Sequence, residues 1–280
     1  GRYGGNNSLD LESYMVVPVG AASFGEGAEK CMEVYQALKR LLTISGYQTG
    51  VGDDGGFVPD LRNSEEALEF IMEAMMLCGY EPGKDMCLAI GAGAESLFDE
   101  GTGFYQFKGE SRMTGVPVER DRNDMIGFYI RLLDGYPVCA VFDGLAEADA
   151  DGWGMLTKML GNRAVFIGQH KNREPGCLKP GERDWACLAD WDGVEENAAG
   201  ISMCGAKSVT AAMEMADLAK RNGLKLAVSQ GYGETEDPYA ADFAAAVNAD
   251  WIRAGAPCRS ERTSKYNELL RIEEWMKVRI

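Results

Sequence analysis

Short apolar runs alternate with longer amphipathic segments along the whole chain, and this alternation limits its fold more than any other feature. Such an order is typical of βα units arranged around a parallel sheet. The predicted strands are Tyr14–Pro18, Met86–Gly91, Val138–Phe142, Ala164–Gly168, Gly200–Cys204, Lys225–Ser229 and Trp251–Ala254. The predicted helices are Ala28–Ser45, Ser64–Cys78, Arg122–Leu133, Gly154–Leu160, Ser208–Asn222, Asp237–Val247 and Arg262–Lys277.

Two of these helices have a clear predicted buried face. The helix that begins at Ser64 has an N-cap residue and an acidic first turn, and its apolar face consists of Ala67, Leu68, Ile71 and Met75. The helix that precedes Gly223 is expected to bury Val209, Met213, Ala216 and Ala219. The stretch Asn172–Gly193 is rich in Pro and Gly and is expected to be a long loop at the end of a strand.

Composition and charge exclude several classes of function. Hydrophobic residues make up 46% and charged residues 26% of the 280 positions, which is typical of a globular protein with a substantial core. The formal net charge of −16 argues against nucleic acid and anionic membrane as partners, because both are bound through clustered Lys and Arg. No apolar run approaches the ~18 residues of a membrane helix, and no export leader is evident.

The cysteines and the histidine limit the chemistry further. Eight cysteines are scattered along the chain without a C-x-x-C pair. Several lie in apolar stretches such as Met86–Ile90 and Tyr136–Phe142, so we expect buried, reduced thiols in a cytoplasmic protein. The single histidine, His170, excludes any mechanism or metal site that needs two imidazoles.

Several segments match the motifs of one known family in order and in spacing. Gly255–Arg262 reads GAPCRSER and, together with Lys265–Glu274, is nearly identical to a C-terminal family signature. Val51–Pro59 reads VGDDGGFVP, Gly233–Asp237 reads GETED, and Met15–Gly20 reads MVVPVG. Through these segments the chain resembles the enolase family over nearly its whole length.

The resemblance implies an α/β fold, an enolase-type TIM-like barrel, formed by residues 1–280 as one domain. The match begins at the glycine-rich turn that follows the family's first barrel strand. That strand and the family's N-terminal α+β domain are therefore expected to be absent. Enolases are usually homodimers with contacts through that domain, so a homo-oligomer or a second chain that completes the barrel is an expected partner.

The metal site implied by the resemblance is changed. Enolases remove a weakly acidic proton next to the carboxylate of 2-phosphoglycerate, and Mg²⁺ held by strand-end carboxylates stabilises the dianionic intermediate. The three ligand positions correspond to Gly91, Phe142 and Gln169, and Asp143 is the one adjacent carboxylate. We therefore expect no metal cofactor, with Mg²⁺ bound only if the family chemistry survives.

The proton-transfer positions implied by the resemblance are changed as well. The catalytic lysine of the family corresponds to Ser202, and of its acid pair Asp54 remains, where the family has Glu. The second glutamate of that pair corresponds to Ser13, and Glu12 is expected to point to the opposite face if this segment is a strand.

The anion-binding positions complete the candidate site. Ser229–Tyr232 reads SQGY where the family has SHRS, which removes an imidazole and a phosphate-binding guanidinium. The family's second lysine corresponds to Arg253, which can still bind an anion. The candidate catalytic residues are Asp54, Ser202 and Arg253, and the candidate ligand-binding residues are Gln230, Gly231, Tyr232, Arg253 and His170.

Two functions from different classes fit this pattern. The first is a pseudoenzyme, in which the barrel is kept for binding, regulation or assembly and cannot convert 2-phosphoglycerate to phosphoenolpyruvate. The second is a repurposed or residual enolase-superfamily lyase that acts on a small phosphorylated or carboxylate substrate. Its further candidate groups are Glu95, Asp143, His170 and Lys171. In either case a small anion is the expected ligand of the barrel mouth.

Overall fold

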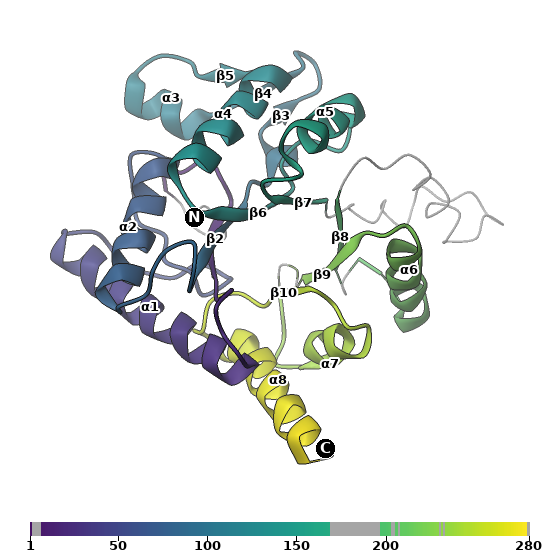
Figure 1. The fold of residues 1–280 in the computed structure, drawn as a ribbon. Coiled ribbons are helices and arrows are strands. Elements are labelled where there is room, and N and C mark those ends of the chain that lie inside the picture. Colours follow the sequence, from purple (N-terminus) through teal and green to yellow (C-terminus); the bar gives the residue numbers. More distant parts are fainter. Residues whose placement is uncertain are drawn as a thin grey trace.

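The computed structural model describes residues 1, 7–168, 197–202, 205–206, 208–229, 231 and 233–278. Seven strands form one curled sheet in the order β1-β2-β6-β7-β8-β9-β10 (Figure 1). The strands are β1 (Ser13–Val17), β2 (Cys87–Gly91), β6 (Val138–Phe142), β7 (Val165–Gly168), β8 (Ala198–Ser202), β9 (Lys225–Ser229) and β10 (Trp251–Arg253). β1 is antiparallel to β2, and all other neighbours are parallel.

Helices cover the outside of this sheet, as in an α/β barrel (Figure 1). They are α1 (Phe24–Ile44), α2 (Ser64–Leu77), α4 (Arg122–Gly135), α5 (Ala150–Leu160), α6 (Val209–Arg221), α7 (Tyr239–Ala246) and α8 (Ser260–Val278). In the described part of the chain no backbone pairing joins β1 to β10, so the barrel is open between these strands. None of the described helices is long and apolar enough to cross a membrane.

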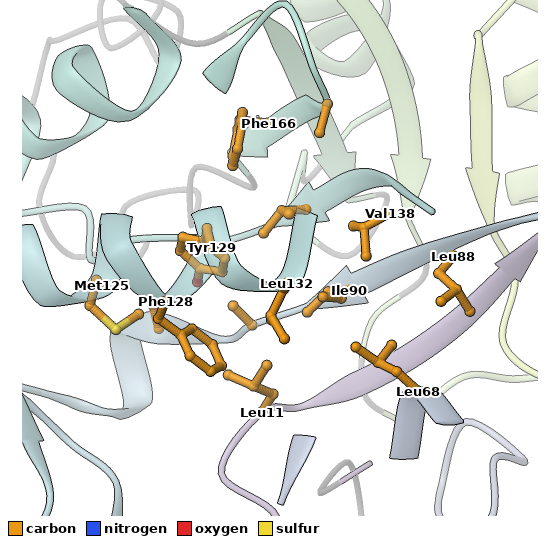
Figure 2. Close-up of a cluster of buried hydrophobic side chains, with 14 of the residues drawn as sticks. Leu11, Leu68, Leu88, Ile90, Met125, Phe128, Tyr129, Leu132, Val138 and Phe166 are labelled. Carbon is orange, nitrogen blue, oxygen red and sulfur yellow. The ribbon is translucent and has the colours of Figure 1, made fainter. Parts of the chain in front are cut away.

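The core is divided between the two faces of the sheet, because side chains alternate along a strand. Figure 2 shows part of the outer core, in which Phe128 and Leu132 of α4 lie near Ile90 of β2. The α4 helix begins with a reciprocal capping box between Asp121 and Asp124. The inner core is smaller and consists of Ala89, Ala140, Phe142, Val165, Ile167, Ala198 and Ala227.

Every predicted strand and helix has a counterpart, with shifts at some boundaries. The strand predicted at Gly200–Cys204 begins two residues earlier, at Ala198, and residues 203–204 lie outside the described part. The helix predicted at Gly154–Leu160 begins at Ala150, because the side chain of Asp149 accepts a hydrogen bond from the N–H of Gly152 and caps it. The predicted long loop Asn172–Gly193 also lies outside the described residues.

A small subdomain between β2 and α4 was not predicted. It contains a 3₁₀ turn, a three-stranded antiparallel sheet and a short helix: η1 (Ala94–Ser96), β3 (Phe98–Asp99), β4 (Phe104–Gln106), α3 (Lys108–Thr114) and β5 (Glu119–Arg120). Strands of two or three residues are too short to show the alternation from which strands are predicted.

The predicted buried faces agree for α2 but not fully for α6. Ala67, Leu68, Ile71 and Met75 of α2 are all buried, as expected. In α6, however, Val209 is 54% exposed and Met213 is 45% exposed. The buried residues of that helix are Ala212, Met215, Ala216 and Ala219. The prediction gave too much weight to the large side chains, whereas the small alanines face the strands.

Two buried cations fix α8 to loops at the carboxyl ends of the strands. Lys265 is fully buried, and its Nζ donates to the carbonyl oxygens of Thr235 (2.6 Å) and Glu261 (2.8 Å). The same Nζ lies 3.0 Å from Oε2 of Glu234. Arg262, also buried, donates from Nε to the carbonyl oxygen of Asp53 (2.9 Å). Burial of the Lys265 charge is tolerated because three oxygen atoms surround it.

We predict that Lys265→Met lowers the free energy of unfolding by about 3 kcal/mol, because Glu234 loses its buried cation. Urea denaturation measures this change. The control is Lys277→Met, which removes a surface ion pair to Glu273 and should change stability by less than about 0.5 kcal/mol. Equal effects of the two substitutions would contradict the anchoring role of Lys265.

Candidate functional site

Polar residues gather where the parallel strands end, at the face of the barrel that we call the barrel mouth. Side chains alternate along each strand, so the inner core residues show which positions face the inside of the barrel. The last inward-facing position of each strand then lies at the barrel mouth. These positions are Ser13, Gly91, Phe142, Ser202, Ser229 and Arg253. The described part of this layer therefore contains hydroxyl groups and a guanidinium, and it lacks a carboxylate.

The guanidinium of Arg253 lies against residues of other strands in this layer. Its Nη2 donates a hydrogen bond of 3.1 Å to Oγ of Ser13, on the far edge strand of the open barrel. The guanidinium carbon lies 5.6 Å from the centre of the Phe142 ring, within the range of a cation–π contact. With 12% of its side chain exposed, Arg253 connects β10 to β1 and β6 across the barrel mouth.

Glu12 also contributes to the barrel mouth, whereas the sequence placed it on the opposite face on condition that its segment is a strand. Its Oε1 lies 3.8 Å from Nη2 of Arg253, and only 12% of its side chain is exposed. The prediction assumed that the strand included Glu12, but β1 begins at Ser13, so the strict alternation does not apply. Glu12 therefore supplies a negative charge next to the guanidinium.

The position of Gly91 has no room for a side chain. A Cβ atom there would lie 2.3 Å from Oγ of Ser13 and 3.3 Å from Nη2 of Arg253. An aspartate, which the family resemblance would place at this position, cannot be accommodated without moving both groups.

Two of the three positions that the resemblance assigns to metal ligands therefore do not fit Mg²⁺, which needs oxygen ligands in near-octahedral geometry, and the third, Gln169, lies outside the described residues. Gly91 and Phe142 offer no side-chain oxygen. Asp143 has a left-handed backbone (φ 51°), and its N–H donates to the carbonyl oxygen of Ile167 (2.9 Å). Among the described residues, no group of three or more His, Cys, Asp or Glu side chains is arranged to bind a metal ion.

Asp54 lies in the loop 51–57, which the C-terminal signature holds in place. Its Oδ1 accepts a hydrogen bond from the N–H of Gly56 (2.8 Å), and its carbonyl oxygen accepts one from the N–H of Ala256 (2.7 Å). Gly55 has a positive φ of 77°, and a Cβ there would lie 2.7 Å from the carbonyl oxygen of Cys258, so glycine is required. Asp54, Ser13 and Arg253 line one cavity of about 210 Å³.

The other side of the barrel mouth contains Ser202, Ser229 and Gly231. Ser202 and Ser229 are neighbours at the ends of β8 and β9, and Ser229 is also the neighbour of Arg253. Among the described residues, the fully buried Oγ of Ser229 has no hydrogen-bond partner. The N–H of Gly231 donates to Oε1 of Glu234 (3.0 Å), the carboxylate that Lys265 holds.

The structure thus brings together part of the predicted site. Asp54 and Arg253 line the same cavity, whereas Ser202 and Gly231 lie on other strand ends. Glu95 is used locally, because its Oε2 accepts a hydrogen bond from the N–H of Glu147 (2.9 Å). The candidates Gln169, His170, Lys171, Gln230 and Tyr232 lie outside the described residues.

Sequence reasoning missed the roles of Glu12, Ser229 and the Lys265–Glu234 pair. The Lys265–Glu234 pair could have been predicted, because both residues belong to motifs that resemble one family. The role of Glu12 could not be predicted from the sequence, since its position depends on where β1 begins.

An open α/β barrel with polar residues at the carboxyl ends of its strands defines the class of TIM-like barrel proteins. Comparison with known families narrows this class. Residues 1–279 match the family described as "Enolase, C-terminal TIM barrel domain". The chain therefore belongs to the enolase C-terminal barrel family, and the fold expected from the sequence is confirmed. Membership of this family establishes the fold, whereas the chemistry has to be inferred from the residues of the site.

We predict that Gly91→Ala lowers the free energy of unfolding by about 1–3 kcal/mol, because the added methyl group overlaps Ser13. The double variant Ser13→Ala/Gly91→Ala should be more stable than expected from the sum of the two single substitutions, since the overlapping oxygen is removed although its hydrogen bond from Arg253 is lost. Thermal and urea denaturation measure both effects.

The matched control is Gly127→Ala in α4, where a Cβ has no atom within 4 Å. This variant should be more stable than the parent by about 0.5–1 kcal/mol, because alanine favours the helix. A Gly91→Ala variant as stable as Gly127→Ala would show that the space at Gly91 is not filled.

Proposed function

We propose that this enolase-family barrel is non-catalytic toward 2-phosphoglycerate and serves as a binding, regulatory or assembly protein. One observation carries the proposal: the Arg253 guanidinium lies against Gly91 and Phe142, two of the positions that the family resemblance assigns to Mg²⁺ ligands. An arginine is permanently protonated, so it opposes the entry of a second cation into the same space.

The loss of the metal removes the main source of stabilisation for the family reaction. Removing a proton next to a carboxylate produces a dianion, and a bound metal supplies several kcal/mol of charge stabilisation. Each ~1.4 kcal/mol lost slows the reaction about tenfold. The position of the base holds Ser202, and a neutral hydroxyl does not accept a proton from a weak carbon acid near pH 7. The lack of a metal ion and the lack of a base both slow the removal of the proton.

The charges in the barrel mouth also limit the binding of anions. The Arg253 cation lies 3.8 Å from the Glu12 carboxylate, and Asp54 lines the same cavity. A doubly charged phosphate ester would gain one guanidinium contact and be repelled by two carboxylates. We therefore infer weak binding of such esters.

A second candidate function is the recognition of a small carboxylate or phosphate, either as a ligand or as the substrate of a metal-independent lyase. The observation in its favour is the buried Ser229 hydroxyl, which has no partner among the described residues and lies on the strand next to Arg253. A ligand oxygen there would satisfy this group. Calorimetric titration with small carboxylates in the presence of EDTA, which removes free metal ions, separates this function from the first.

We predict that calorimetry shows no Mg²⁺ binding tighter than about 1 mM, and that 2-phosphoglycerate gives no phosphoenolpyruvate. A catalytically active enolase in the same assay is the positive control. Tight Mg²⁺ binding with turnover would overturn the proposal.

An assembly role would use the open edges of the barrel. The outer edges of β1 and β10 present backbone groups that no described strand pairs with, and such edges accept an added strand. We propose that a strand from a second chain pairs there. Mass-resolved size exclusion is expected to show a dimer or a heterologous complex, and a stable, soluble monomer would count against it.

A further inference from the structure

Two cysteines lie side by side at the end of the barrel opposite the mouth. Cys87 is the first residue of β2, and Cys139 is the second residue of β6, its parallel neighbour. The register pairs Leu88 with Val138 and then Ala89 with Ala140, so Cys139 is an extra residue in β6. Cys87 precedes the Leu88–Val138 pair and Cys139 follows it, so the two cysteines are diagonal neighbours on strands that lie ~4.8 Å apart.

Both side chains face the inside of the barrel, because Cys87 lies two residues before the inward Ala89 and Cys139 packs against the inner core. The two thiols influence each other electrostatically, and Sγ of Cys139 donates to the carbonyl oxygen of Leu88 (3.3 Å). Cys139 packs against the inner core, and both cysteines are half-buried. The two thiols therefore lie near each other on the inside of the barrel, and neither residue is fully buried.

We propose that Cys87 and Cys139 form a reversible disulfide when they meet a low-molecular-weight disulfide such as oxidised glutathione. The site is a modification site for thiol–disulfide exchange, and it is independent of the proposed function of the barrel mouth.

The environment distinguishes the two thiols. Burial and, to a smaller extent, the nearby Cys87 raise the pKa of Cys139 to about 12, so Cys139 is the protonated partner. Burial also raises the pKa of Cys87, but the hydrogen bond with Cys139 acts in the opposite direction. Charged groups that face the pair include Lys225, whose positive charge favours a thiolate at Cys139. Cys87 is therefore the group that attacks first.

The exchange proceeds in two steps. The Cys87 thiolate attacks one sulfur of glutathione disulfide, forms a mixed disulfide and releases one glutathione thiolate. Cys139 then loses its proton to solvent and attacks the Cys87 sulfur, which releases the second glutathione. In total two protein thiols are oxidised, glutathione disulfide is reduced, and two molecules of glutathione leave. Excess reduced glutathione reverses both steps.

The test is incubation of the full chain with oxidised glutathione near pH 8, followed by acid quenching, alkylation and peptide mapping by mass spectrometry. We expect a peptide cross-linked through Cys87 and Cys139, with a loss of about 2 Da relative to the two reduced peptides. Mapping is needed because Cys177, Cys187 and Cys204 also occur in the chain. The oxidised protein should unfold at a temperature roughly 5 °C higher.

Two single variants test the order of the steps. Cys139→Ser should accumulate a glutathione adduct at Cys87, whereas Cys87→Ser should leave Cys139 largely unmodified. Cys78→Ser, a half-buried cysteine outside the pair, is the control and should form the same cross-link as the parent. Circular dichroism establishes that each variant is folded.

Glutathione adducts without the Cys87–Cys139 peptide would overturn the proposal, as would equal modification of Cys139→Ser and Cys87→Ser. Neither result affects the metal or turnover measurements, so failure here is distinguishable from failure of the proposed function.

Discussion

The arrangement of the barrel mouth depends on the contact between the Arg253 guanidinium and the edge of β1. A cation placed there needs acceptors, and Ser13 and Glu12 supply them from the opposite side of the open barrel. The contact also requires glycine at position 91 and is covered by the Phe142 ring. Several differences from the family pattern that look unrelated in the sequence thus belong to one set of contacts around Arg253, and under the proposed function this fixed organic cation takes the place of a metal ion.

The segments that resemble the family most closely bind one another in the structure. The C-terminal signature holds the loop 51–57 through Ala256 and Arg262, and Lys265 holds the loop that contains Glu234. Their main role visible here is mechanical, because they fix loops at the mouth through buried cations and backbone hydrogen bonds. Because these contacts are mechanical, the presence of the motifs does not by itself establish activity.

The sequence predicted the fold well and the site only in part. Strands such as Val138–Phe142 are buried on both faces and read as continuous apolar runs, so they were found with correct boundaries. The short strands near Phe104 carry no such signal. At the site, Arg253 and Gly91 were identified by position in the chain, but their contact depends on long-range geometry. Glu12 was misplaced because a one-residue change in where β1 begins alters the direction of its side chain.

The most direct test is the crystal structure of the full chain grown with Mn²⁺, a Mg²⁺ analogue whose position is revealed by anomalous scattering. We predict that no Mn²⁺ ion lies in the barrel mouth and that the Arg253 guanidinium contacts Ser13 beside Gly91. An Mn²⁺ peak between Gly91 and Phe142, with the Arg253 side chain displaced, would contradict the replacement of the metal by arginine.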